Sequence, residues 1–337
     1  MNVSLEYLRS CANETGYRIE PLEKVVRLGE MAADIKRHPL LGAVLALKGG
    51  TAFNLCFGPP KRLSVDLDYN YVGQLDRAAM PEARPVVEQA VVDLARRQGY
   101  RVQQSADAFA GRKFYLLYRS VLGPEERIEV DLNFLFRLPI AGTEVRELWQ
   151  PGALDRPSIR VVSLEEILIG KFLALLDRGA VRDAWDMAYP PPSSAEVFQS
   201  ILFRRWFIAL ASILEHPLTT YTRDRLEAGI TDRDVEERLA PLLAGVLPDR
   251  KELSERAWAA LGGFLTLEPH EEEFITAVQR GELQPELLFP DDPKEAECIA
   301  AHPAILWKME NVRKYLARPA RPGRGDAKDN QKRHSGL

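Results

Sequence analysis

Hydrophobic and polar positions follow two different periods along the first part of the chain. Residues 20–36 carry apolar side chains at helical intervals, and a His-Pro pair ends the run, so this segment is predicted to be a helix. Residues 62–71 and 127–136 alternate at every second position, which predicts strands with one buried face. Further strands are predicted over residues 43–47 and 113–119, and further helices over residues 52–57 and 81–98.

Helical spacing continues after residue 162. Ser163 and Glu166 form a capping-box pattern, which predicts a helix over residues 163–178. Gly179 interrupts it, and helical spacing resumes over residues 182–189. The run of three prolines and two serines at residues 190–194 is the strongest breaker in the chain and the best candidate for a domain boundary.

No strand pattern is found after residues 190–194. Amphipathic stretches predict helices over residues 197–214, 234–246, 253–264, 271–280 and 303–317. The chain is therefore predicted to have an α+β fold, in which a mixed sheet flanked by helices precedes an all-helical C-terminal part. The predicted division is an α/β domain with its following helices at residues 1–189, a helical domain at 195–317 and a disordered basic tail at 318–337.

Composition supports an ordinary globular protein. Of 337 residues, 46% are hydrophobic and 28% are charged, which excludes a mainly disordered chain. Cys11, Cys56 and Cys298 lie far apart and form neither a disulfide framework nor a zinc motif, which fits a reducing compartment. No apolar stretch approaches the ~20 residues that span a bilayer, and the first twenty residues lack a signal sequence. We expect a cytoplasmic protein with no membrane partner.

The charge is uneven along the chain. The net charge is -4, yet residues 318–337 hold six Lys and Arg against two Asp. A basic tail on an acidic body is compatible with an anionic partner, but such tails are more often simply solvated and disordered.

The strand pattern at residues 62–71 places Ser64, Asp66, Asp68 and Asn70 on one face. Alternate residues of a strand lie ~6.6 Å apart, so the two carboxylates can converge on a hard cation. An Asp-x-Asp pair by itself is weak evidence. A second pair occurs at residues 232–234 without a strand pattern or a glycine turn, and we interpret it as a solvated helix face.

Gly49, Gly50 and Thr51 lie between a predicted strand and a predicted helix, shortly before Asp66. Glycines let the backbone approach a ligand closely, and a helix N-terminus offers N–H groups and a positive dipole end to a phosphate. Thr51 can cap the helix or donate to a phosphate oxygen. The alternative is a tight strand-to-helix turn with a capping threonine.

Asp131 supplies a possible third carboxylate on the polar face of the strand over residues 127–136. It would meet Asp66 and Asp68 if the two strands are neighbours, and three such carboxylates can hold two Mg²⁺ ions. Glu129 is a less favoured substitute, and an exposed sheet residue is the alternative for Asp131.

Lys171 falls on the apolar stripe of the capped helix, where a lysine either extends to water or meets an anion. Arg182 and Asp186 have the spacing of a surface ion pair. Spacing alone assigns no function to either.

Together these segments resemble a known family. Residues 47–53 (LKGGTAF), residues 62–68 (RLSVDLD), Lys171 and residues 182–186 (RDAWD) are similar to the AbiEii/AbiGii nucleotidyltransferase toxins, a branch of the DNA polymerase β-like nucleotidyltransferases. The similarity covers roughly residues 10–190. It implies metal ligands at Asp66 and Asp68, with Lys171 and Asp186 as further active-site residues. It also implies contacts of the glycine-Thr turn and the R-x-S motif with the triphosphate, through Gly49, Gly50, Thr51, Arg62, Ser64 and Lys171.

The resemblance also implies a role. Family members act as toxins of toxin–antitoxin or phage-defence systems beside an AbiEi-type antitoxin, and several add nucleotides to the 3′ end of tRNA. We therefore expect a Mg²⁺-dependent enzyme with two bound ions that transfers a nucleoside monophosphate from an NTP to RNA, with Asp131 as base or metal ligand. Two alternatives remain. The acceptor could be a protein or a small molecule, or the chain could be a non-catalytic scaffold in which Asp66 and Asp68 bind structural cations or pair with Arg62.

Overall fold

The first half of the chain folds around one mixed sheet. The computed structural model describes residues 3–74, 80–108 and 110–317. The strands are β1 (Leu45–Lys48), β2 (Asp66–Tyr71), β3 (Arg101–Gln104), β4 (Gly111–Arg119), β5 (Glu125–Asn133), β6 (Thr143–Glu147) and β7 (Ser158–Val162). Their order in the sheet is β3-β4-β5-β2-β1-β7-β6. β2 runs parallel to β5 and β1 parallel to β7, whereas the other neighbours are antiparallel. The α+β class is confirmed.

Helices surround the sheet and make up the second half. They are α1 (Leu5–Thr15), α2 (Ile19–Arg37), α3 (Leu41–Val44), α4 (Gly49–Cys56), α5 (Met80–Arg97), α6 (Leu164–Arg178), α7 (Val181–Ala188), α8 (Ser194–Phe198), α9 (Ile201–Ala211), α10 (Arg223–Gly229), α11 (Asp232–Asp234), α12 (Arg250–Leu265), α13 (Pro269–Gln279), α14 (Pro293–Ala301) and α15 (Pro303–Leu316). Short 3-10 helices occur at Leu218–Thr220, Ala240–Leu242 and Pro285–Leu287, and a π-helix at Val235–Leu239.

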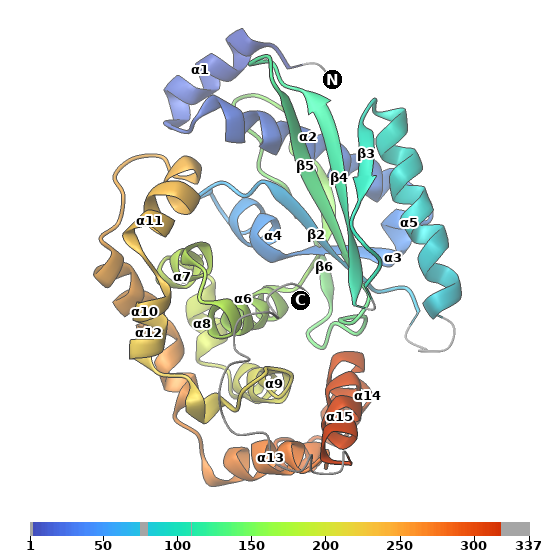
Figure 1. The fold of residues 1–337 in the computed structure, drawn as a ribbon, viewed down its shortest axis with the longest axis vertical. Coiled ribbons are helices and arrows are strands. Elements are labelled where there is room, and N and C mark those ends of the chain that lie inside the picture. The colour runs from blue at the N-terminus through green and yellow to red at the C-terminus, as the bar shows by residue number, and fades with distance from the viewer. Residues whose placement is uncertain (1–2, 75–79, 109, 318–337) are drawn as a thin grey trace, which may run out of the picture.

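The layers explain how the second half meets the sheet. In Figure 1, α2, α3 and α5 lie along one side of the sheet, and α4, α6 and α7 lie on the other. α4 packs against β1 and β2, α6 packs on α4, and α12 packs against α7. Phe172 of α6 contacts the rings of Phe203, Phe207 and Phe264, with centroids 5.2–6.1 Å apart. The hydrophobic core is therefore continuous between the sheet-bearing part and the helices that follow.

Most predicted elements are confirmed, and the exceptions have local causes. The strand predicted from residue 62 begins only at Asp66, because the preceding Leu63 donates its backbone N–H to Leu242 O at 2.8 Å and not to a strand. β3, β6 and β7, which are four or five residues long, were not predicted. The single helix predicted over residues 234–246 is wrong. Pro241 cannot continue a helix, and short turns replace it.

The capping box is only half present. Ser163 Oγ accepts a hydrogen bond from Glu166 N at 3.3 Å, as predicted. The second hydrogen bond of a capping box, from Ser163 N to the Glu166 carboxylate, is not formed. The carboxylate instead accepts a hydrogen bond from Ala141 N at 3.3 Å.

Strands end at Val162, so the helical second half is confirmed for the described residues. The division at residues 190–194 stays a prediction, and the basic tail predicted at 318–337 lies outside the described residues. Among the helices that the structure describes, none has the length and apolar character needed to cross a bilayer.

Candidate active site

Two acidic strands are neighbours in the sheet. Asp68 of β2 lies directly opposite Asp131 of β5, and Asp66 lies opposite Glu129. Partnered residues of adjacent strands project from the same face of a sheet, so these four carboxylates share one face. The expectation that the strands of Asp66, Asp68 and Asp131 are adjacent is confirmed, although they are separated by more than fifty residues in the sequence.

Two lysines flank the central aspartates. Lys48 of β1 is the partner of Asp68, and Lys113 of β4 is the partner of Asp131. The row across four strands is therefore Lys48, Asp68, Asp131, Lys113. Lys113 Nζ lies 3.4 Å from Asp131 Oδ2. Sequence reasoning missed the lysines as site residues, because strand alternation does not tell which strand lies next to which.

Asp66 and Asp131 lie in surroundings that disfavour their charged forms. Burial raises the pKa of Asp66, and the neighbouring Asp68 charge adds to it, while Arg182 opposes the rise. Burial also raises the pKa of Asp131, with Lys113 opposing and Asp68 adding to the rise. Acidic groups that are desolvated and repel one another favour binding of a cation. This charge pattern fits a divalent metal better than an ordinary solvated strand face.

The turn formed by Gly49, Gly50 and Thr51, here called the glycine corner, lies directly against the carboxylate of Asp68. Gly49 starts α4 with φ +72°, a conformation that side chains rarely adopt. A Cβ atom added to it would lie 3.0 Å from Asp68 Cγ. Glycine at this position therefore serves two purposes, because it permits the turn and leaves room for the carboxylate.

Gly50 faces a cluster of hydrogen-bond donors. A Cβ atom on Gly50 would lie 2.8 Å from Ser64 Oγ, 3.2 Å from Arg62 Nη2 and 3.7 Å from Lys171 Nζ. Two cations and a hydroxyl thus surround the glycine backbone at the N-terminus of α4. Such a set of donors suits a phosphate group.

Thr51 does not cap the helix as the sequence suggested. Lys48 occupies the N-cap position of α4, and Thr51 is two residues inside. Its side chain is fully buried, and its hydroxyl donates to the backbone oxygen of Asp66. Thr51 therefore ties the glycine corner to the start of β2.

A buried ion network lies behind the corner. Arg62 donates to Asp186 twice, from Nε to Oδ1 and from Nη2 to Oδ2, both at 2.7 Å. Lys171 Nζ lies 2.6 Å from Asp186 Oδ2, and Asn54 donates to Asp186 Oδ1 at 3.1 Å. Asp186 is 1% exposed; its burial acts to raise the pKa, but Arg62 and Lys171 outweigh it and lower the pKa to about 2. Lys171 therefore meets an anion and does not extend to water.

This network gives Asp186 its partners. The spacing of Arg182 and Asp186 also suited a surface ion pair, but Asp186 is bound by Arg62 and Lys171 in the interior. Arg182 reaches toward Asp66, with Nη1 3.7 Å from Asp66 Oδ2. The pairing of Arg62 with Asp66 and Asp68, one form of the scaffold alternative, is not observed, because Arg62 Nε and Nη2 both donate to Asp186.

Asp183 is a member of the network that the sequence did not reveal. Its Oδ1 lies 3.5 Å from Lys171 Nζ, and its Oδ2 accepts from Arg178 Nε at 2.7 Å. Burial acts to raise the pKa of Asp183, but Lys171 and Arg178 lower it. The signals in the sequence are its place in the RDAWD segment and its position three residues before Asp186, on the same face of α7.

The described residues contain no group of three or more His, Cys, Asp and Glu side chains placed to hold a metal ion on their own. Proteins usually bind Mg²⁺ through one or two carboxylates, with water and substrate phosphates completing the shell. Asp68 and Asp131, which are direct partners across β2 and β5, could offer oxygens of this kind, and Asp66 lies two residues along β2.

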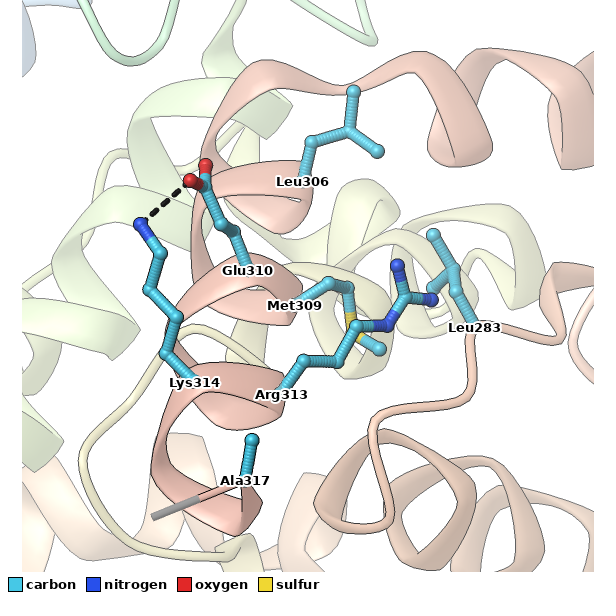
Figure 2. Close-up of a pocket in the computed structure, with 7 residues that line it drawn as sticks. All are labelled: Leu283, Leu306, Met309, Glu310, Arg313, Lys314 and Ala317. Carbon is cyan, nitrogen blue, oxygen red and sulfur yellow. Dashed lines mark hydrogen bonds and ion pairs between the residues drawn. The ribbon is translucent and has the colours of Figure 1, made fainter.

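A separate hollow of about 580 Å³ lies along α15. Figure 2 shows Leu306 and Arg313 at its wall, with Lys314 paired to Glu310 at 2.6 Å. None of its lining residues belongs to the sheet or to α4, α6 or α7, so it takes no part in the site described above.

Comparison with known proteins identifies the family. A profile described as "Nucleotidyl transferase AbiEii toxin, Type IV TA system" matches residues 34–274, more than half of the chain. The chain belongs to this family. Among solved structures, the nucleotidyltransferase toxin MenT4 from Mycobacterium tuberculosis H37Rv is similar in fold, with a TM-score of 0.63 and 17% sequence identity over 89% of this chain and 99% of that one. No curated protein matches the chain.

Family membership establishes the class of activity. This AbiEii protein is a nucleotidyltransferase toxin of a type IV toxin–antitoxin system. The family implies use of an NTP and an antitoxin as partner. The glycine corner and the acidic strands described above lie within the matched residues, so the geometry and the family refer to the same part of the molecule.

Proposed function

We propose that this AbiEii protein transfers a nucleoside monophosphate from an NTP to an RNA hydroxyl with the help of Mg²⁺, and that the acceptor is the 3′ end of a tRNA. The observation that carries the catalytic part is the register of β2 and β5, which sets Asp68 opposite Asp131 beside the glycine corner. The carboxylates that would bind the metal therefore lie next to the hydrogen-bond donors around Gly50 that would bind the phosphates.

The triphosphate is assigned to the Gly50 corner. The backbone of Gly49 and Gly50, the Ser64 hydroxyl, and the Arg62 and Lys171 side chains supply donors and positive charge there. Asp186 holds both cations in place through contacts of 2.6–2.7 Å. It therefore acts as a positioning residue. Thr51 supports the corner through its bond to Asp66 and does not contact phosphate through its buried hydroxyl.

We assign the acceptor hydroxyl to the acidic face, which is the face of the sheet that carries Asp66 and Asp68 of β2 and Glu129 and Asp131 of β5. Bound Mg²⁺ would supply charge neutralisation on the phosphates and a lowered pKa for the attacking hydroxyl. Asp66 and Asp68 would hold it, and Asp131 would take the proton of the hydroxyl or serve as a further ligand. Lys113 keeps Asp131 in position at 3.4 Å, and the preorganised charges do most of the catalytic work.

An RNA acceptor is supported by the charges at the edge of this face. Arg182 approaches Asp66, and Arg178 lies nearby with 62% of its side chain exposed. Guanidinium groups beside the metal ligands can contact the phosphodiester backbone, and such contacts make binding salt-sensitive.

The experiment is transfer of label from each of the four NTPs to total tRNA with Mg²⁺, comparing the parent protein with Asp68→Asn. We expect the substitution to lower the rate at least ~100-fold, as loss of an electrostatic contact in an active site commonly does. The control is Asp232→Asn, which alters the second Asp-x-Asp pair at a side chain 83% exposed and should leave the rate unchanged. Equal labelling by Asp68→Asn and the parent would refute the catalytic assignment. Labelling of protein in place of RNA would refute the acceptor.

A further inference from the structure

A second hollow, of about 350 Å³, lies where the C-terminal end of α6 meets α10 and α12. Leu176 and Leu261 belong to its apolar floor, and both are buried. Tyr221 and the half-buried Trp258 are its aromatic lining residues, and its charged ones are two cations, Arg178 and Arg225, and one acid, Asp177. The volume is at the lower end of the ~300–1,000 Å³ of small-ligand pockets, which suits one compact ligand with an apolar ring and a polar group.

The hollow adjoins the active site through Arg178. This residue lines the hollow and donates to Asp183, which in turn contacts Lys171 of the ion network. Directly after it, Gly179 ends α6 and the chain turns into α7, whose Arg182 approaches Asp66. Figure 1 shows α10 and α12 beside α6 and α7, with α4 on the other side of α7. A ligand in the hollow therefore adjoins Arg178, and through it the ion network, without occupying the Gly50 corner.

Arg225 gives the hollow an available positive charge. Its guanidinium carbon lies 4.8 Å from the centroid of the Tyr221 ring. Within residues 3–74, 80–108 and 110–317, no acidic side chain forms an ion pair with it. A guanidinium held on an aromatic ring and not neutralised by a carboxylate is suited to a phosphate, and the neighbouring Trp258 is suited to stacking on a base.

We propose that this hollow binds the terminal nucleotide of the acceptor RNA. Its base would rest against Trp258 over the apolar floor, and Arg225 would contact its phosphate. This inference rests on the proposed function and names the part of the molecule that receives the acceptor. The incoming NTP could supply the same chemistry, but its phosphates are assigned to the Gly50 corner, whereas the hollow is built from α10 and α12 of the helical part.

The test measures binding of radiolabelled tRNA without nucleotide, and the KM values for tRNA and for the NTP. Stacking of one base contributes ~1–3 kcal/mol, so Trp258→Ala is expected to raise the Kd and KM for tRNA ~5–150-fold. Trp258→Phe should restore most of the loss. Arg225→Gln should reduce the slope of log K against log salt by about 1. The matched control is Arg223→Gln on the same helix, whose side chain pairs with Glu255 at 2.6 Å and does not line the hollow.

The outcomes separate this inference from the proposed function. A tRNA Kd within twofold of the parent value for both Trp258→Ala and Arg225→Gln overturns it, as does a parent protein that binds no tRNA. A rise confined to the KM for the NTP also overturns it and assigns the hollow to the incoming nucleotide. A parent that binds tRNA in the expected manner but labels it with none of the four NTPs contradicts the proposed transfer alone. Thermal unfolding of each variant verifies that it is folded.

Discussion

Replacement of Asp186 by asparagine tests the buried ion network. Asp186 is the carboxylate shared by Arg62 and Lys171, and removal of one partner from a buried ion pair typically costs ~3–5 kcal/mol. A pKa of about 2, against an ordinary 3.8, corresponds to about 2 kcal/mol of stabilisation at neutral pH. Asp183 still partners Lys171 at 3.5 Å, and asparagine retains an oxygen acceptor. We therefore expect Asp186→Asn to lower the free energy of unfolding by about 2–4 kcal/mol.

The loss of unfolding free energy caused by Asp186→Asn should be smaller at acidic pH. Because folding lowers the pKa of Asp186, its contribution is complete above the unfolded-state value near 3.8 and declines as the pH falls toward 2. The difference between parent and variant should shrink between pH 7 and pH 3. The assay is urea unfolding at both pH values, with the exposed Asp232→Asn as a control that changes stability by less than about 0.5 kcal/mol. A loss below about 1 kcal/mol at pH 7, or one equally large at pH 3, would refute the reasoning.

Three further predictions concern the glycine corner and a buried acid. Gly49→Ala should destabilise the protein by at least about 1 kcal/mol and abolish transfer, because φ is +72° and the new methyl group meets Asp68; urea unfolding and label transfer measure both effects. Gly50→Ala should raise the KM for the NTP with little loss of stability, because its Cβ meets the movable Ser64 hydroxyl; an unchanged KM contradicts the phosphate assignment. Burial raises the pKa of Glu166 to about 7 from 4.5, so the native protein loses stability as the pH rises through this interval. Glu166→Gln should therefore increase the free energy of unfolding by up to about 3 kcal/mol at pH 8 and not at pH 4, and equal effects at both values count against it.

The sequence determined the local features of this protein. Alternation along residues 62–71 and 127–136 indicated strands and gave the faces of Asp66, Asp68 and Asp131, since the period of a strand depends only on its own residues. The glycine turn and the helix after it were also visible, because few other residues adopt such a conformation.

Only the tertiary structure decided which of these segments meet. The pairing of Asp68 with Asp131, and of Asp66 with Glu129, depends on how strands distant in sequence are packed into one sheet. The partners of Asp186 could not be assigned from the sequence for the same reason. Helical spacing allowed a pair with Arg182, but the tertiary structure brings Arg62, from the segment between α4 and β2, and Lys171 of α6 to Asp186 and buries all three. Long-range packing sets both burial and charge pairing, and neither is encoded in the spacing of neighbouring residues.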